Sequence, residues 1–506
     1  MYKQYLSLLK QAVILIKYVL ALDEGTTSAR TVLFDSDCRV VSMAQREFTQ
    51  IYPKEGWVEH NAVEIYAMQL ASVTECVAKS GVSPSDIAAI GITNQRETTV
   101  VWDKHTGEPI CNAIVWQCRR TADICEQLQG RGVSNYVAEK TGLRIDAYFS
   151  GTKLKWILDN VPDARRRAEK GDLLFGTVDC WLLWKLTGGK IHATDRTNAS
   201  RTMLYDLSAD RWDDTMLEIL DIPACMLPEV RSSSELFGFT DIMGSQIPVC
   251  GIAGDQQSAL FGQGCFEAGE AKNTYGTGCF LLSNTGTKRS EVKNGLIVTA
   301  AATCKGEPVQ YAAEGSIFAA GAVIQWLRDE LHIIKSSAQS EEMAMQADNN
   351  GGVYLVPAFV GMGAPYWDMR ARAAIFGMTR GTDRNILCRA ALESIAYQTN
   401  DLIRVMRSAG FPLKCLKADG GASQNSFLMQ FQADISDTDV LLPVSPEATA
   451  LGAALLAGLA VGVWRDRSAI KGKLATGIKY TPNMDAFERE KLLDGWQRAV
   501  LACRSF

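Results

Sequence analysis

Histidine is scarce in this 506-residue chain, and the potential sulfur ligands are scattered. The four histidines, which are His60, His105, His192 and His332, lie far apart in the sequence, so they form no histidine-based metal motif. The 14 cysteines include no C-x-x-C pair. This pattern disfavours a zinc site and a disulfide framework, and it is typical of reduced thiols in a cytosolic protein.

Two common nucleotide-binding motifs are also missing. No G-x-x-x-x-G-K-[ST] sequence occurs, which excludes a P-loop enzyme, and no G-x-G-x-x-G follows an expected strand, which disfavours a dinucleotide-binding fold. The formal net charge is -5, whereas a general nucleic-acid binder usually has a basic excess. A chain of 506 residues is too long for one hydrophobic core, so we expect two domains.

Long apolar segments are few. Residues 1–16 somewhat resemble a signal peptide, but Lys10 divides the apolar run and no A-x-A cleavage site follows. We therefore expect residues 1–17 to be a leader of unknown role, with secretion as a minor alternative. Residues 448–464 carry no charge and are rich in Gly and Ala, but their length is at the lower limit for crossing a bilayer. We expect a buried helix there, no membrane span, and a cytoplasmic protein.

The rest of the chain has an α/β pattern that is repeated in its two halves. The first half is expected to form strands at residues 18–22, 31–34, 39–42 and 87–93 and a helix at residues 64–79. The second half has a strand, a Gly-Thr-Gly turn and a strand over residues 271–284. We predict an internal duplication, with one domain over residues 18–263 and the other over residues 264–506.

Each half has a Gly-Thr turn between two strands, at residues 25–28 and at residues 276–278. Backbone N–H groups and hydroxyls in such a turn can hold phosphate, and glycine permits close approach. A single Gly-Thr turn is more often a plain hairpin, so only the pair favours a polyphosphate held across a cleft. Asp23 precedes the first turn and can hold Mg²⁺ through water, because hard cations prefer oxygen ligands.

Nine longer segments carry a family resemblance: LALDEGTTSAR, AAIGITNQRETT, AIVWQCRRTA, DAYFSGTKLKWIL, TNASRTML, GIAGDQQSALFGQ, KNTYGTGCF, GAPYWD and DGGASQNSFLMQFQADI. Together they resemble glycerol kinases, within the carbohydrate kinases of the actin-like ATPase fold, over about residues 18–496. The resemblance implies an α/β fold with two duplicated actin-like (ribonuclease H-like) ATPase domains and an interdomain cleft. It also implies ATP and Mg²⁺ as cofactors, and direct in-line transfer of the γ-phosphate to glycerol, giving sn-glycerol 3-phosphate.

The resemblance also implies roles for individual residues. The glycerol-binding set would be Arg96, Glu97, Trp116, Tyr148, Asp255, Gln256 and Phe280. The nucleotide-binding set would be Thr26, Thr27, Ser28, Arg30, Thr277, Gly321, Gln325, Gly421 and Asn425. Asp255 matches the catalytic base, and Asp23 matches the acidic residue that serves magnesium. The first domain would carry the glycerol site and one phosphate loop, and the second domain the other loop and the adenosine site.

The chemistry of the glycerol-binding set agrees with this assignment. Glycerol has hydroxyls on one edge and C–H groups on the other, so its recognition needs carboxylates and guanidinium groups facing aromatic carbon. Arg96 and Glu97 are adjacent and cannot share a face within a strand, so we expect a bend. From the residues alone, plainer alternatives stay open: a surface ion pair for these two, a core aromatic for Trp116, and a helix N-cap for Asp255.

Two other functions remain open, namely a kinase for a pentulose or gluconate and a non-catalytic ATP-binding scaffold. Glu24 stands where the family also has glutamine, and it would add a negative charge near the phosphates, which bears on nucleotide affinity. The family often forms dimers or tetramers, so we expect a homodimer or homotetramer. Nucleic acid is not expected as a partner.

Some bacterial relatives are inhibited by fructose 1,6-bisphosphate through a Gly-rich, Arg-containing loop before the catalytic aspartate, and others are activated by phosphorylation of a histidine in the same region. Here residues 239–248 read FTDIMGSQIP, and residues 232–271 contain no Lys, Arg or His. A bisphosphate needs cationic or multiple N–H donors, of which Arg is the usual choice. We predict that both controls are absent at this loop.

Overall fold

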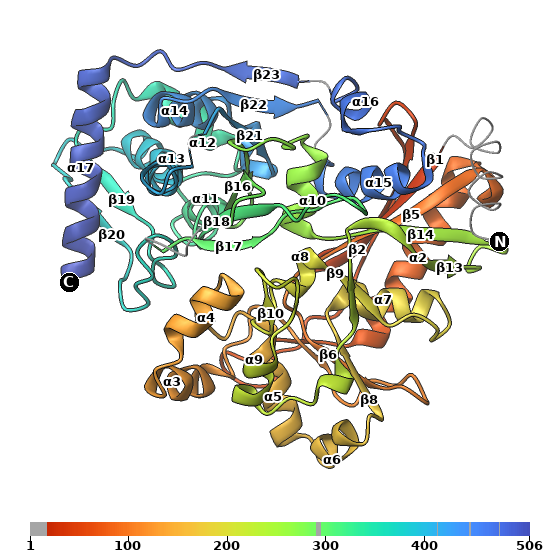
Figure 1. Cartoon of the computed structure of the whole chain (residues 1–506). Coiled ribbons are helices and arrows are strands. Elements are labelled where there is room, and N and C mark those ends of the chain that lie inside the picture. Colours follow the sequence, from red (N-terminus) through yellow and green to blue (C-terminus); the bar gives the residue numbers. More distant parts are fainter. Residues whose placement is uncertain (1–17, 290–294, 412, 445–446, 475) are drawn as a thin grey trace.

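Two β-sheets of matching topology organise the chain in the computed structural model, which describes residues 18–289, 295–411, 413–444, 447–474 and 476–506 (Figure 1). The expected leader, residues 1–17, lies outside the described residues. The first sheet has the strand order β13-β14-β5-β1-β2-β3. Its strands are β1 Tyr18–Glu24, β2 Ser28–Asp35, β3 Val40–Glu47, β5 Ile87–Asn94, β13 Ser234–Thr240 and β14 Ile247–Gly254.

The second sheet has the strand order β17-β18-β16-β15-β21-β22-β23. Its strands are β15 Glu270–Tyr275, β16 Cys279–Gly286, β17 Ile297–Ala300, β18 Tyr311–Ile317, β21 Cys415–Asp419, β22 Val440–Pro443 and β23 Thr476–Tyr480. In each sheet the first strand pairs antiparallel with the next strand in sequence and parallel with a later one, as β1 does with β2 and β5, and β15 with β16 and β21. The order β3-β2-β1-β5-β14 thus corresponds to β18-β16-β15-β21-β22, which confirms the predicted duplicated, ribonuclease H-like α/β fold.

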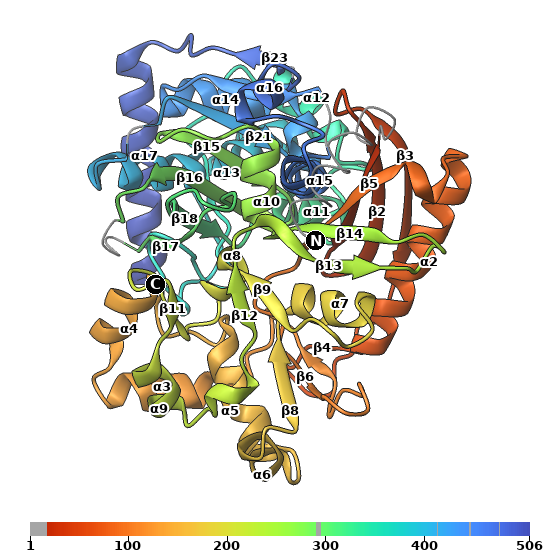
Figure 2. The ribbon, with the colours of Figure 1, turned by 45° about the vertical axis from the view of Figure 1, so that its right-hand side comes forward.

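A separate lobe is formed by the chain between β5 and β13, and it lies below the first sheet in Figures 1 and 2. Its main elements are β6 Val100–Asp103, α3 Ala122–Gly130, α4 Ser134–Thr141, α5 Ser150–Asn160, α6 Ala164–Glu169, β8 Leu173–Gly176, α7 Val178–Leu186, β9 Ala193–Asp195, α8 Arg196–Ala199, α9 Asp214–Leu220 and β12 Glu229–Arg231. Buried apolar side chains such as Leu143, Phe149 and Ile157 give the lobe a hydrophobic core of its own. The lobe places Trp116, Tyr148 and Arg201 beside the end of β5.

Helices α2 and α13 flank the first and second sheets, respectively. Helix α2 (Ala62–Ser80) starts earlier than residue 64, where the sequence predicted it, because the Asn61 side chain caps it by accepting from the amides of Val63 and Glu64. The helices of the second half are α11 Gly321–Asp329, α12 Gln339–Gln346, α13 Arg384–Ser408, α14 Ser426–Ser436, α16 Arg467–Lys471 and α17 Ala486–Ser505. A single hydrophobic core joins most of these helices to the second sheet.

Helix α15 (Ala448–Val461) is buried, as the sequence predicted for this uncharged segment. It packs on the first sheet, although it comes from the second half of the chain: a Cβ on Gly91 of β5 would lie 2.1 Å from the Ala453 carbonyl oxygen. A Cβ on Gly262, at the end of α10 (Asp255–Gly262), would lie 2.0 Å from the Ala448 carbonyl oxygen. Glycine is therefore required where β5 and α10 meet α15.

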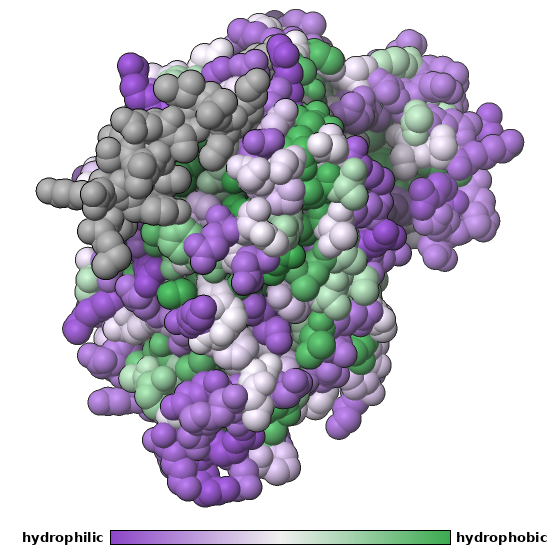
Figure 3. Space-filling view, turned by 90° about the vertical axis from the view of Figure 1, so that its right-hand side faces the viewer, coloured by the Kyte–Doolittle hydropathy of each residue, from purple (hydrophilic) through white to green (hydrophobic). Residues whose placement is uncertain are grey.

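The surface at the right of Figure 1 is mainly hydrophilic, with apolar side chains gathered in a band between polar ones (Figure 3). Strand β3 is an edge of the first sheet and exposes Val40, Val41 and Met43. Among the helices of the described ranges, none is both long and apolar enough to cross a membrane.

Candidate functional site

Three parallel strands of the first sheet end side by side, and predicted site residues follow each end. The register aligns Glu24 at the end of β1 with Asn94 of β5, and Asn94 with Gly254 of β14. The first phosphate turn follows β1, Arg96 follows β5 and Asp255 follows β14. Because the carboxyl ends of parallel strands share one edge of a sheet, three segments far apart in sequence converge there.

Arg96 and Glu97 form a sharp bend immediately after β5. Glu97 has φ 61°, a left-handed value, and the Thr98 amide donates to the Arg96 carbonyl at 2.7 Å. Arg96 Nε then lies 3.9 Å from Glu97 Oε1, so both side chains reach the same region, as the sequence predicted. A left-handed backbone at a non-glycine residue costs roughly 1 kcal/mol or more, and it persists only where surrounding contacts hold it.

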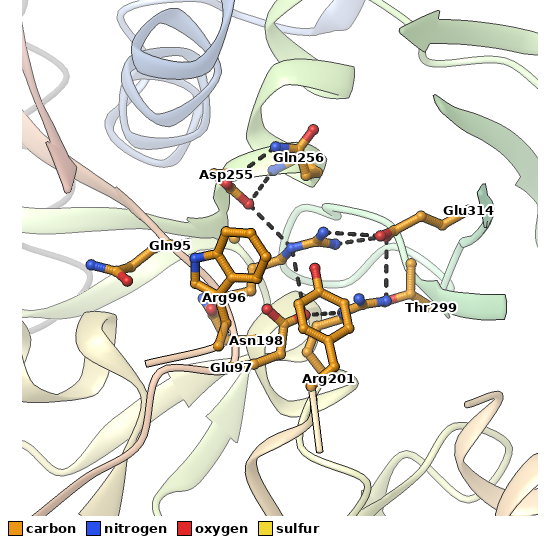
Figure 4. A network of polar contacts seen from close by, with 12 residues as sticks. Gln95, Arg96, Glu97, Asn198, Arg201, Asp255, Gln256, Thr299 and Glu314 are labelled. Carbon is orange, nitrogen blue, oxygen red and sulfur yellow. Dashed lines mark hydrogen bonds and ion pairs between the residues drawn. The ribbon is translucent and has the colours of Figure 1, made fainter. Parts of the chain in front are cut away.

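A buried ion network holds this bend (Figure 4). Glu314 on β18 accepts hydrogen bonds from Arg96 Nη1 at 2.7 Å and Nη2 at 3.0 Å, and from Arg201 Nη1 at 3.3 Å. Arg201 Nε donates to Glu97 Oε1 at 2.5 Å. These four residues are at most 3% exposed, so Arg96 and Glu97 are not a surface ion pair.

Opposite charges counter the effect of burial in this network, fully at Glu314 and Arg96 and only in part at Glu97, whose pKa burial still raises. Burial raises the pKa of Glu314, but Arg201 and Arg96 outweigh it and lower the pKa to about 2. Burial lowers the pKa of Arg96, but Glu314 and Glu97 outweigh it and raise that pKa well above its ordinary value. Charges fixed away from water interact more strongly than exposed ones, so the network is a rigid electrostatic frame.

Asp255 lies at the exposed edge of this frame, as the first residue of α10. Arg96 Nε lies 3.1 Å from its Oδ1, and Gln256 Nε2 donates to its Oδ2 at 3.1 Å. The Asp255 side chain is 31% exposed, whereas that of Arg96 is 2% exposed, so this carboxylate can meet a ligand. The N-cap of α10 is Gly254, so the N-cap alternative for Asp255 is wrong. A Cβ on Gly254 would lie 2.7 Å from Arg96 Cγ and Cδ, which explains the glycine.

An aromatic pair lies between the ion network and the first phosphate turn. The rings of Trp116 and Tyr148 meet edge to face, with centroids 5.6 Å apart. Trp116 Nε1 donates to Thr26 Oγ1 at 3.0 Å, and the Arg201 guanidinium lies 5.4 Å from the centre of the Tyr148 ring. Phe280 is on β16, beside Thr274 in the register of the second sheet. The core alternative for Trp116 is wrong, since its ring is only partly buried.

The second phosphate turn, between β15 and β16, is joined directly to helix α11. The Gly276 amide donates to the Gly278 carbonyl at 2.9 Å, and the Gly321 amide donates to the Gly276 carbonyl at 2.9 Å. A Cβ on Gly321 would lie 2.7 Å from that same carbonyl oxygen, so only glycine allows this approach. Thr277 at the turn and Gln325 on α11 are both exposed.

The segment after β21 completes this end of the second sheet. Gly420 has φ 88°, and a Cβ there would lie 2.6 Å from the Tyr275 carbonyl oxygen, just before the second turn. Gly421 is exposed, and a Cβ there would meet no atom within 4 Å. Asn425 caps α14, its Oδ1 accepting from the Leu428 amide at 2.9 Å. The predicted nucleotide residues of the second half thus lie on adjoining segments, next to open space.

The first phosphate turn has Asp23 at its base and Thr27 exposed at its tip. Asp23 Oδ2 accepts from Arg30 Nε at 3.1 Å, and Arg30 Nη1 lies 2.7 Å from Glu447 Oε2. In the parts of the chain that the structure describes, no cluster of three or more His, Cys, Asp or Glu could hold a metal ion. One carboxylate with phosphate oxygens and water is nevertheless a usual donor set for Mg²⁺, so Asp23 fits such an ion.

Ser28, a predicted nucleotide contact, lies at the end of this turn, and Glu24 lies just before it. The Ser28 hydroxyl accepts from Gln45 Nε2 at 2.8 Å. Glu24 is fully buried, and burial raises its pKa well above its ordinary value. Burial therefore favours the neutral acid, which opposes the extra negative charge that the sequence suggested near the phosphates.

Three charged residues of the site were missed by the sequence reasoning. Arg201 and Glu314 belong to the buried network, and Lys272 on β15, which is 0% exposed, donates to Gln256 Oε1 and to Thr274 Oγ1. A glutamate within an otherwise apolar strand is a signal of a buried charged partner, and β18 carries that signal at Glu314, whereas β15 is largely polar and does not. Sequence alone does not tell which partner it is.

Comparisons with known proteins agree with this geometry. Residues 18–262 match the model of the N-terminal domain of the FGGY family of carbohydrate kinases, and residues 271–461 match that of the C-terminal domain. The chain is 60% identical over 489 residues to a glycerol kinase of Clostridium beijerinckii, covering 96% of this chain and 98% of the relative. It is 59% identical over 492 residues to a glycerol kinase of a Shewanella species, covering 97% and 99%.

Solved structures of related kinases have a similar fold. A Plasmodium falciparum glycerol kinase with ADP superposes with a TM-score of 0.92 at 36% identity, covering 96% of this chain and 98% of the other. A xylulose kinase from Lactobacillus acidophilus superposes with a TM-score of 0.86 at 21% identity, covering 96% and 98%, and shares the fold.

Proposed function

The chain belongs to the FGGY family of carbohydrate kinases, and we propose that within this family it transfers the γ-phosphate of ATP to a terminal hydroxyl of glycerol. Relatives named glycerol kinase match it at 59% and 60% identity over nearly the whole chain, which supports glycerol as the acceptor over a pentulose or gluconate. The ADP in the Plasmodium falciparum structure supports a nucleotide at the corresponding site.

One observation carries the proposal: a partly exposed carboxylate, Asp255, is held by Arg96 and Gln256 at 3.1 Å each, in a site whose wall includes the pair Trp116 and Tyr148. Carboxylates and guanidinium groups suit the hydroxyl edge of glycerol, and aromatic rings cover its C–H edge. A scaffold without catalysis would have no use for a carboxylate oriented in this way at a nucleotide site. The buried network fixes these groups in advance, which lowers the cost of ordering them on binding.

The reaction then needs one bond exchange. The terminal hydroxyl of glycerol gives its proton to Asp255, and its oxygen forms a bond to the γ-phosphorus. The bond between the γ-phosphorus and the oxygen that bridges to the β-phosphate breaks, and that oxygen leaves with ADP. Phosphoryl transfer depends mostly on positioning and on neutralising charge, so fixing the hydroxyl oxygen in line matters as much as removing its proton.

The two Gly-Thr turns hold the polyphosphate from the two halves of the molecule. Thr26, Thr27, Ser28 and Arg30 belong to the first turn and the strand after it, and Thr277 to the second. Backbone N–H groups and hydroxyls donate to phosphate oxygens at such turns. Gly321, Gln325, Gly421 and Asn425 hold the adenosine. Asp23 would hold Mg²⁺, which neutralises charge on the phosphates when it is bound.

Location and assembly follow from the same proposal. A kinase that uses ATP and carries 14 cysteines, all of them free thiols, suits the reducing cytoplasm. A homodimer or homotetramer is supported by the apolar side chains that the edge strand β3 exposes, since exposed sheet edges are places where chains pair.

A coupled assay of ADP release tests the function. Purified protein is given ATP and Mg²⁺ with glycerol, xylulose, gluconate or no acceptor. We expect ADP release with glycerol at a kcat/KM at least tenfold above that of the other acceptors, since one charged hydrogen bond is worth about 1.5–3 kcal/mol. Equal release without an acceptor would show an ATPase, and a preference for xylulose would assign a different kinase.

A further inference from the structure

Two buried charged residues lie in one row across the second sheet and face the base from the other half of the molecule. The register aligns Lys272 of β15 with Leu282 of β16, and Leu282 with Glu314 of β18. Side chains directly aligned across neighbouring strands point to the same face of a sheet. Both Lys272 and Glu314 are 0% exposed, and the apolar Leu282 lies between them.

Each of these residues binds one of the two groups that hold Asp255. Glu314 accepts two hydrogen bonds from Arg96, whose Nε lies 3.1 Å from Asp255 Oδ1. Lys272 donates to Gln256 Oε1, and Gln256 Nε2 donates to Asp255 Oδ2 at 3.1 Å. Arg96 and Gln256 thus hold the two oxygens of the carboxylate (Figure 4), and a residue of the second sheet binds each of them.

The contact with Lys272 decides which way the Gln256 amide faces. A lysine ammonium has three donors and no acceptor, so it binds only the oxygen of the amide. The amide NH₂ is then turned to Asp255, which accepts through both oxygens when ionised. If the amide turned over, its NH₂ would face the ammonium and its oxygen would face the carboxylate, and both contacts would be repulsive.

We propose that Lys272 is a positioning residue for the phosphoryl transfer: by fixing the Gln256 amide, it fixes the orientation of the Asp255 carboxylate. This inference rests on the proposed function, in which Asp255 is the base. Lys272 also faces two carboxylates, Asp419 and Asp255, which partly offset the effect of burial on its pKa. Because Lys272 and Glu314 come from the second sheet, the base is aligned only while both halves of the chain are in contact.

Lys272→Met tests the proposal, because methionine has a similar length and no donor. We expect kcat with glycerol to fall roughly 10- to 100-fold, the effect of a small misplacement of a reacting group, while the Kd for ADP stays unchanged. Lys417→Met is the matched control. Lys417 lies beside Lys272 in the register of β21, but its Nζ donates to the Gln263 carbonyl, away from Asp255. We expect Lys417→Met to keep the wild-type kcat.

A second background separates positioning from a merely structural role. In a Gln256→Leu chain the amide is gone, so Lys272→Met should change kcat by less than about twofold, because coupled residues are not additive. Equal losses of kcat in the two backgrounds would overturn the proposal, since Lys272 would then act without Gln256.

If Lys272→Met does not fold, Lys272→Gln takes its place in the wild-type and Gln256→Leu backgrounds. Glutamine keeps a hydrogen-bond donor but not the positive charge. Inactive wild-type protein with glycerol would overturn the proposed function together with this inference. Active wild type with an unaffected Lys272→Met chain would overturn the inference alone.

Discussion

Replacing Asp255 with asparagine tests the assignment of the base with the smallest change in shape. The carboxylate has Arg96 Nε 3.1 Å from one oxygen and Gln256 Nε2 3.1 Å from the other. Asparagine keeps one oxygen, so it satisfies only one of these donors, and its own NH₂ group faces the other. The variant loses the proton acceptor, one negative charge and one hydrogen bond.

The magnitude follows from these losses. A general base contributes about 10²- to 10⁴-fold to a rate, and each tenfold corresponds to about 1.36 kcal/mol. The Asp255 side chain is 31% exposed, so water screens part of the lost charge, and we expect the lower end of the range, about 10²-fold in kcat. The Kd for ADP should stay unchanged, because the second turn and the segments after β18 and β21 do not include Asp255.

Coupled ADP release at saturating glycerol and ATP gives kcat, and calorimetric titration gives the Kd for ADP. Asp241→Asn is the control, because this substitution makes the same chemical change at an exposed residue in the turn between β13 and β14. A kcat for Asp255→Asn within about threefold of wild type, equal to about 0.65 kcal/mol, would refute the assignment of the base.

Four further outcomes are expected. Arg96→Ala and Glu97→Ala raise the KM for glycerol by roughly 10- to 150-fold, the worth of one charged hydrogen bond, in steady-state kinetics; an unchanged KM in both would make the two residues structural. Glu24→Gln raises the Tm progressively as the pH rises above 4.5, because the raised pKa of the buried Glu24 makes the wild type lose stability there, and the two Tm values meet below that pH; equal Tm values at pH 7 would show that Glu24 is not strained by burial. Small-angle scattering gives a smaller radius of gyration with glycerol and a non-hydrolysable ATP analogue, because the phosphate turns belong to different halves; an unchanged radius argues against closure. Fructose 1,6-bisphosphate leaves activity unchanged at fixed glycerol and ATP, because residues 232–271 contain no Lys, Arg or His; saturable inhibition at a sub-millimolar concentration would contradict this.

Local rules of the backbone allowed the main features of the fold and part of the site to be predicted from sequence. The pattern of a strand, a Gly-Thr turn and a second strand occurs in both halves of the chain and indicated the duplication, because two copies of one domain use the same kind of turn. The bend at Arg96 and Glu97 could be predicted because side chains alternate along a strand, so two adjacent residues cannot face the same site without a bend. The left-handed backbone of Glu97 makes this bend. The uncharged segment at residues 448–464 indicated a buried helix, because its Gly and Ala residues allow close packing.

The rest of the site depends on contacts between distant parts of the chain. Glu314 is 218 residues from Arg96 in sequence, and no local pattern links them. The same holds for α15, which packs on the sheet of the other half. The raised pKa of Glu24 depends on its complete burial, which the sequence motif does not reveal, since the residue adjoins an exposed turn.

Transfer of labelled phosphate in a single turnover tests the central claim most directly. Excess purified protein is mixed with γ-labelled ATP, Mg²⁺ and glycerol, and label is followed on ATP, protein, inorganic phosphate and glycerol phosphate. We expect label to pass from ATP to glycerol 3-phosphate without appearing on the protein, and the Asp255→Asn chain to be slower by about 10²-fold. Label released as inorganic phosphate, or held on the protein before it reaches glycerol, would contradict direct transfer to glycerol at this site.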